Sequence, residues 1–94
     1  MTKARFKGFV LAGHKQAAVE VPFDPAERWG ILAARLWRGR RGYKVRGTFS
    51  GVAFQSVVVP RSKRFWVLVE DKHLVAAGAS VGDTVTVLLE PMSS

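Results

Sequence analysis

The chain has 94 residues, of which 48% are hydrophobic and 11% aromatic, values typical of one folded domain over residues 1–94 and not of a disordered chain. It contains no cysteine, which excludes disulfides, thiolate metal sites and a cysteine nucleophile. Fifteen basic and seven acidic side chains give a net charge of +8, which favours attraction to polyanions.

The N-terminal apolar stretch, Gly8 to Gly13, predicts a strand and not a signal peptide, because it is short and is followed by His14 and Lys15. No apolar run approaches the roughly 20 residues that cross a bilayer. We therefore expect a cytoplasmic protein with no membrane partner, a location with which the absence of cysteine is consistent.

Alternating apolar and polar residues predict strands along most of the chain. Ser50-Gly51 suits a tight reversal between two of them, because glycine tolerates a positive φ. The residues from Pro60 to Arg64 are predicted as a polar, basic loop. The six predicted strands are Ala4–Leu11, Ala17–Val21, Tyr43–Phe49, Val52–Val59, Phe65–Glu70 and Thr84–Glu90.

Two helices are predicted between the strands. The first starts after Asp24, which can cap it, with Pro25 at its first position, and runs from about Ala26 to Arg38, ended by Gly39 and Gly42. Its apolar residues at helical spacing are Trp29, Leu32, Ala33, Leu36 and Trp37. Gly30 falls inside this pattern, so either the helix kinks there or it is shorter than the pattern suggests.

The second helix is short, from Asp71, its predicted N-cap, to Ala77, and Gly78 ends it. Six short strands and two helices indicate a small, mainly β fold: a closed or nearly closed six-stranded barrel, with one longer and one short helix covering an opening. The stripe formed by Trp29, Leu32, Ala33 and Leu36 should lie on apolar barrel surface. Residues 65–69 are apolar on both faces, so their outer face must meet the long helix, a partner chain or a ligand.

The order and spacing of several segments resemble a bacterial family of unknown function, DUF1905. The segments are Val19–Asp24, Val45–Val52, the strand that ends at Pro60, the short helix after Glu70, and Gly82–Val87. The resemblance implies a double-split β-barrel related to the fold of transition-state regulators and antitoxins that bind DNA. It implies no established activity. The chain departs from the family in its basic loop after Pro60 and its longer, arginine-rich segment from Leu32 to Arg41.

The densest charge lies between Arg35 and Arg46, where six of twelve residues are basic and Trp37 and Tyr43 are interleaved. Guanidinium groups pair with phosphates and aromatic faces stack on unpaired bases. The candidate nucleic-acid-binding residues are Arg38, Arg40, Arg41, Lys44, Arg46, Arg61, Lys63 and Arg64. The alternative is that these are solvated helix-end and loop residues, with Trp37 packed in the core.

No catalytic residue, metal ligand or cofactor site is identified. His14 and His73 are isolated and lack partners at metal-ligand spacing. Each acidic residue has a local explanation; Asp83, for example, should stabilise a turn. No serine lies in a nucleophile-elbow motif.

Three functions remain open. The first is a non-catalytic binding or interaction module of unknown ligand. The second is a nucleic-acid-binding domain, with a polyanion as its partner. The third is a small-molecule carrier or enzyme with a pocket between helix and barrel, lined by Trp29, Trp37 and Trp66. We expect a monomer rather than a dimer.

Overall fold

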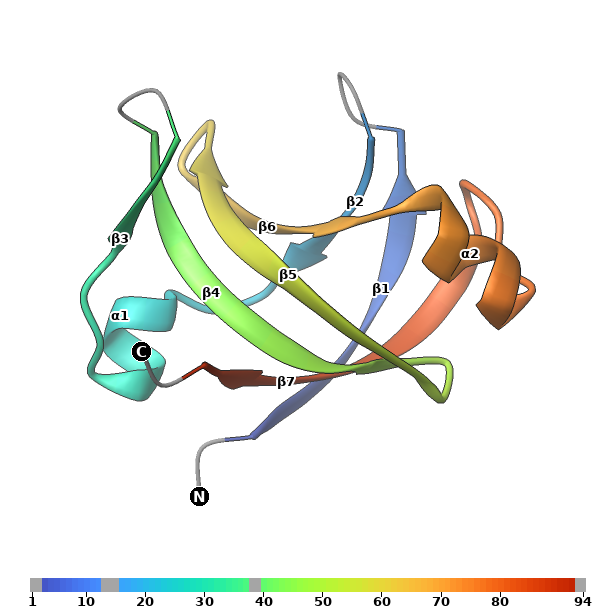
Figure 1. Cartoon of the computed structure of the whole chain (residues 1–94), viewed down its shortest axis with the longest axis horizontal. Helices are drawn as coiled ribbons and strands as arrows, with labels where there is room; N and C mark the ends of the chain where they lie inside the picture. Colours follow the sequence, from blue (N-terminus) through green and yellow to red (C-terminus); the bar gives the residue numbers. More distant parts are fainter. Residues whose placement is uncertain (1–2, 13–15, 38–39, 93–94) are drawn as a thin grey trace.

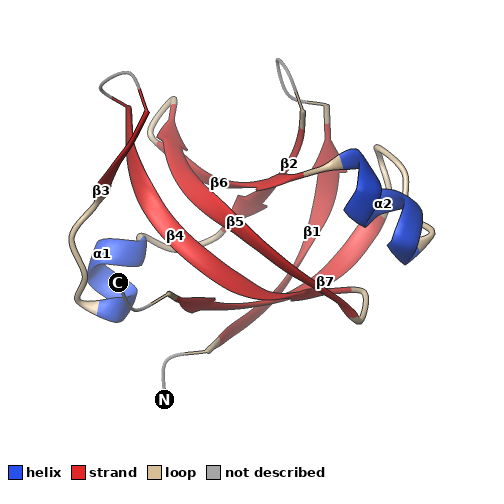
Figure 2. Cartoon of the chain, in the orientation of Figure 1, coloured by secondary structure: helices blue, strands red, loops and turns tan. Residues whose placement is uncertain are grey.

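Seven antiparallel strands and two short helices make up the computed structural model, which describes residues 3–12, 16–37 and 40–92 (Figures 1 and 2). In chain order they are β1 (Ala4–Leu11), β2 (Ala17–Val21), α1 (Pro25–Trp29), β3 (Ala34–Trp37), β4 (Arg40–Phe49), β5 (Val52–Arg61), β6 (Arg64–Val69), α2 (Asp71–Ala77) and β7 (Thr84–Pro91).

Six of these strands close into a barrel, in the order β4-β5-β6-β2-β1-β7. The closing ladder joins β4 to β7, from Val45 opposite Pro91 to Phe49 opposite Val87. The mainly β, six-stranded barrel predicted from the sequence is therefore confirmed. The additional strand, β3, pairs with β4 alone and lies outside the closed ring.

Alternation along the strands fills the barrel with apolar side chains. In β4, Val45 and Phe49 are fully buried, whereas Lys44 and Arg46 are exposed, because successive side chains of a strand point to opposite faces. The buried cluster consists of Val10, Ala17, Val19, Val21, Tyr43, Val45, Phe49, Phe54, Val58, Val67, Val69, Leu74, Val85, Val87 and Leu89.

Two hairpins have two-residue turns with positive φ at both positions, as type I′ turns require. Ser50 and Gly51 have φ of 48° and 83°, which confirms the predicted reversal. Ser62 and Lys63, with φ of 52° and 64°, form the second turn. The predicted loop from Pro60 to Arg64 is therefore wrong, because β5 continues to Arg61 and β6 begins at Arg64.

The single long helix predicted from about Ala26 to Arg38 is also wrong. Helix α1 ends at Gly30, whose φ of 65° and ψ of 32° lie in the left-handed region that terminates helices. Its start is as predicted, since Asp24 Oδ1 accepts a hydrogen bond from the Ala26 N–H at 2.9 Å. Leu32, expected against the barrel, is 92% exposed.

Within the rest of the predicted helix, residues 30–33 are neither helix nor strand, and Ala34–Trp37 form β3, which pairs with β4. Gly42, expected to end the helix, lies inside β4, and Gly39 lies outside the described residues. A Cβ at Gly42 would come within 2.7 Å of Leu36 Cδ1 and 3.3 Å of Val59 Cγ1. The missing side chain thus lets Leu36 of β3 lie over β4 beside Val59.

The two helices lie on opposite sides of the barrel (Figure 1). At the end of α1, the Trp29 ring packs edge-on against that of Phe23, with centroids 5.2 Å apart, and Phe23 packs edge-on against Phe6, with centroids 6.0 Å apart. From α2, Leu74 joins the buried cluster. Helix α2 and its end at Gly78 are as predicted, but its N-cap is Glu70 and not Asp71.

Candidate functional site

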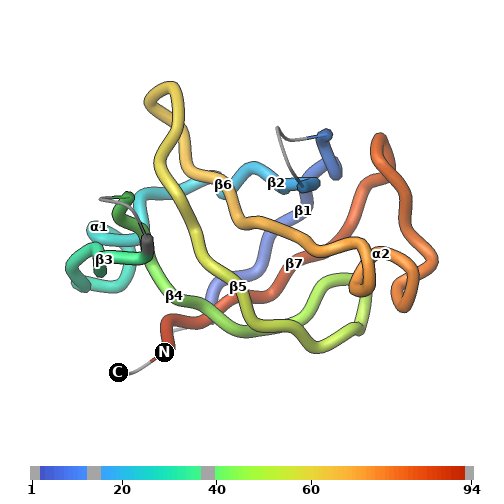
Figure 3. The backbone as a smooth tube through the Cα atoms, turned by 45° about the horizontal axis from the view of Figure 1, so that its top comes forward, coloured from blue at the N-terminus to red at the C-terminus, as the bar shows by residue number. Residues whose placement is uncertain are grey.

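Two neighbouring hairpins carry the basic residues to one end of the molecule. The ladder between β4 and β5 ends at Tyr43 opposite Val58. Beyond it, β4 carries Arg40 and Arg41, and β5 carries Arg61. Figure 1 shows both hairpins extending in the same direction from the barrel, and in Figure 3 the β5–β6 hairpin stands clear of the barrel and apart from β3. We call the exposed residues Arg40, Arg41, Arg61, Lys63 and Arg64 the basic end.

The positive charge of the basic end is only partly neutralised. Arg61 lies directly opposite Arg64 in the β5–β6 ladder, an unfavourable arrangement of like charges. Arg64 Nη1 is 3.2 Å from Glu20 Oε1. Among the ion pairs of the described residues, this one alone involves the basic end. An anion bound between the arginines would relieve their repulsion.

Three further candidates from the sequence lie elsewhere or cannot be placed. Lys44 is exposed on the outer face of β4, opposite Val57. Arg46 lies further along β4, and its Nε donates to Glu90 Oε1 at 2.8 Å. Arg38 lies outside the described residues. The predicted set thus separates into the basic end, Lys44 beside it and an ion-paired Arg46.

Tyr43 is not a surface aromatic, contrary to its predicted place among the basic residues. It is 8% exposed and belongs to the buried cluster, with its ring 6.4 Å from that of Phe65. Burial, with a smaller contribution from Asp24, raises the pKa of its hydroxyl above the ordinary value. Tyr43 therefore contributes to the barrel interior and offers no face to a ligand.

The three tryptophans were predicted to line a pocket between helix and barrel. Trp29, the last residue of α1, packs against the buried cluster, and the side chain of Trp37 lies outside the described residues. Trp66 lies on the outer face of β6, where its Nε1 donates to the Arg61 carbonyl at 3.4 Å. The sequence did not associate Trp66 with the basic residues, although it follows Arg64 by two positions and therefore shares its face.

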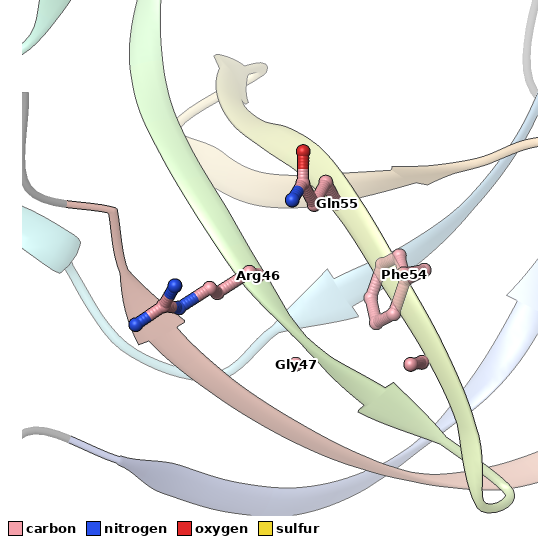
Figure 4. Close-up of a pocket in the computed structure, with 5 residues that line it drawn as sticks. Arg46, Gly47, Phe54 and Gln55 are labelled. Atoms are coloured by element: carbon pink, nitrogen blue, oxygen red, sulfur yellow. The ribbon is translucent and has the colours of Figure 1, made fainter.

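A pocket of about 320 Å³ lies over the β4–β5 hairpin (Figure 4), lined by Arg46, Gly47, Ala53, Phe54 and Gln55. Neither Trp29 nor Trp66 lines it. Figure 4 shows the Arg46 side chain directed away from Phe54, and its guanidinium is bonded to Glu90. The pocket therefore assembles no set of groups suited to acid–base or nucleophilic chemistry.

The histidines and acids form no recognisable metal centre in the parts of the chain that the structure describes. His73 packs against Phe54 at 5.9 Å and Phe49 at 6.4 Å, with its Nδ1 3.8 Å from Glu70 Oε2. His14 lies outside the described residues. Asp83 acts as predicted, because its Oδ2 accepts from the Ser80 N–H at 2.8 Å.

None of the helices within the described ranges has the length and apolarity that a membrane crossing requires. Among curated proteins, none matches this chain. The family model described as a domain of unknown function, DUF1905, matches residues 6–89. That range includes the hairpins of the basic end and nearly the whole barrel, and it confirms the resemblance found in the sequence: the chain belongs to the DUF1905 family.

Proposed function

We propose that this DUF1905 domain is a non-catalytic binding module that holds the phosphate backbone of a nucleic acid at its basic end. The observation that carries the proposal is the direct opposition of Arg61 and Arg64 across a hairpin whose turn adds Lys63. The exposed Arg40 and Arg41 follow from the neighbouring hairpin.

Arginine suits this ligand because its guanidinium presents a planar fork of donors that matches phosphate oxygens. The basic end is exposed, so a phosphate can reach it without displacing packed side chains. The net charge of +8 adds a long-range attraction for a polyanion. The resemblance to barrels that bind DNA, expected from the sequence, agrees with this proposal but rests on analogy of fold.

The proposal is tested by fluorescence anisotropy with a labelled oligonucleotide across a series of salt concentrations. The logarithm of the association constant should fall linearly with the logarithm of salt concentration, because each contacted phosphate releases counterions. The double variant Arg61→Gln/Arg64→Gln should bind more weakly and with a slope smaller by about 2.

Arg46→Gln is the matched control. Arg46 is also an exposed arginine on a barrel strand, but its charge is paired with Glu90, so the loss of its guanidinium should alter binding less than the loss of Arg61 and Arg64. Binding that is indifferent to salt, no binding at low salt, or equal losses in the control and the double variant would each reject the basic end as the site.

A further inference from the structure

We infer that the nucleic acid held at the basic end is single-stranded, and that one of its bases stacks on the indole of Trp66. This inference rests on the proposed function and names the class of nucleic acid that the same end would take. It depends on the position of Trp66, on the cations around it and on the support beneath its ring.

Trp66 lies on the outer face of the barrel, between two opposing residues. In the register it is opposite Val59 on β5 and Glu20 on β2. Val67, the next residue, is fully buried in the interior, so Trp66 points outward by alternation. Its side chain is therefore available to a ligand that approaches the wall of the barrel.

The indole has a fixed position. Its N–H donates to the carbonyl of Arg61, which directs the ring across the β5–β6 ladder toward the hairpin tip. Val59 also points outward, yet it is only 5% exposed. Leu36 lies on one side of Val59, over Gly42. Trp66 lies directly opposite Val59 on the neighbouring strand. We infer that one face of the indole covers Val59, while Trp66 as a whole stays partly exposed.

The cations of the basic end border this ring. Arg64 precedes Trp66 by two residues on the same face, which places their Cα atoms about 7 Å apart. Arg61, opposite Arg64, supplies the carbonyl that fixes the indole. The Glu20 carboxylate near the ring is held by Arg64, which reduces its repulsion of a phosphate. An aromatic face bordered by arginines is the combination that proteins use to bind unpaired strands.

A duplex cannot use this arrangement, because its bases are already stacked and paired inside the helix. It offers phosphates only, whereas an unpaired strand offers phosphates to the arginines and a base to the indole. We therefore expect the domain to prefer a single strand to a duplex, and to bind an oligonucleotide more tightly than the same sugar-phosphate chain without bases.

The test compares three labelled probes of equal length by fluorescence anisotropy: a single-stranded oligonucleotide, its fully abasic counterpart and a duplex. The wild-type protein should bind the single strand about 5- to 150-fold more tightly than the abasic probe, the range expected for one stacked base. Trp66→Leu keeps an apolar side chain over Val59 and should reduce this ratio to near one. Trp66→Phe keeps an aromatic face and should retain part of the preference.

Leu32→Ala is the control, because Leu32 is also apolar and exposed but lies between α1 and β3; it should leave all three affinities unchanged. Circular dichroism checks that each variant is folded. If Trp66→Leu does not fold, the wild-type ratio and the Trp66→Phe variant still decide the matter.

Equal wild-type affinity for the single strand and the abasic probe would overturn the stacking inference and leave the basic end as a phosphate site. A Trp66→Leu variant that keeps the wild-type ratio of affinities would overturn it too. So would Trp66 variants that weaken binding of the single-stranded and abasic probes equally, because the ring would then serve only to support the hairpin. No binding of any probe at low salt would instead reject the proposed function itself.

Discussion

Gly47 on β4 lies so close to the backbone of β7 that a Cβ at this position would overlap the carbonyl oxygen of Leu88 and come within 3.1 Å of Leu89 Cα. Gly47 sits in the ladder that closes the barrel, opposite Leu89. The absence of a side chain is therefore a condition of closure, since the atoms that a Cβ would meet belong to the backbone and cannot rotate away.

Gly47→Ala should consequently destabilise the protein strongly, by roughly 3 kcal/mol or more in the free energy of unfolding, measured by urea denaturation. Gly51→Ala is the control, because a Cβ at Gly51 meets open space and pays only for its φ of 83°, about 1 kcal/mol. If the two variants lost similar amounts of stability, β4 and β7 would be able to move apart at little cost in free energy.

Lys63→Gly should affect stability and binding in opposite directions. Lys63 holds a φ of 64°, which glycine adopts more readily, so the free energy of unfolding should rise by about 1 kcal/mol. The same change removes one cation from the basic end and should reduce the salt slope of oligonucleotide binding by about 1. A variant that gains stability with an unchanged salt slope would exclude Lys63 from phosphate contact.

Tyr43 should make the folded state sensitive to alkaline pH. Its pKa is raised in the barrel, so above about pH 10 the unfolded chain loses the phenolic proton first. The free energy of unfolding should therefore fall as the pH rises from there toward the folded-state pKa. In Tyr43→Phe this part of the fall should disappear, while lysine titration remains common to both proteins.

Denaturation of both proteins at about pH 9 and about pH 11 measures this difference. Tyr43 is the only tyrosine of the chain, so tyrosinate absorbance also reports its titration directly. Parallel losses of stability in the two proteins would contradict the raised pKa.

Leu74 should be the main apolar anchor of helix α2, whose other fully described residues are exposed or only partly buried. Leu74 is buried in the barrel cluster, and Leu74→Ala should cost about 2–5 kcal/mol of stability through lost contacts and the cavity left behind. Its neighbour Val75 is 81% exposed, and Val75→Ala should change stability by no more than about 0.5 kcal/mol. Thermal unfolding of the two variants measures this difference in stability. A mild effect of Leu74→Ala would show that the packing of α2 against the barrel contributes little to the stability of the fold.

The barrel was predictable because its signals are local. Alternation along β1, β4 and β7 and the Ser50-Gly51 turn are visible in short stretches of sequence. The prediction of a long helix was wrong because the helical spacing of Trp29, Ala33 and Leu36 is a coincidence. Gly30 was the signal for its early end, and the pairing of β3 with β4 depends on contacts that no short window of sequence contains.

The candidate site was partly predictable for the same reason. The sequence identified the basic residues, and the hairpin between β4 and β5 was enough to bring two clusters to one end. The sequence did not show that the charge of Arg46 is paired, because its partner, Glu90, comes from β7, 44 residues away. Nor did it place Trp66 beside the arginines, since the ring was expected beneath a helix that does not exist.

The outer side of β3 is an open edge of backbone hydrogen-bonding groups in the described ranges, since β3 pairs with β4 alone. An open edge of this kind can recruit the strands of other molecules into fibrils. Here the edge is only four residues long, its pairing is irregular between Arg35 and Trp37, and Arg35 adds a charge. Concentrated solutions of this protein should therefore form no fibrils and remain free of turbidity.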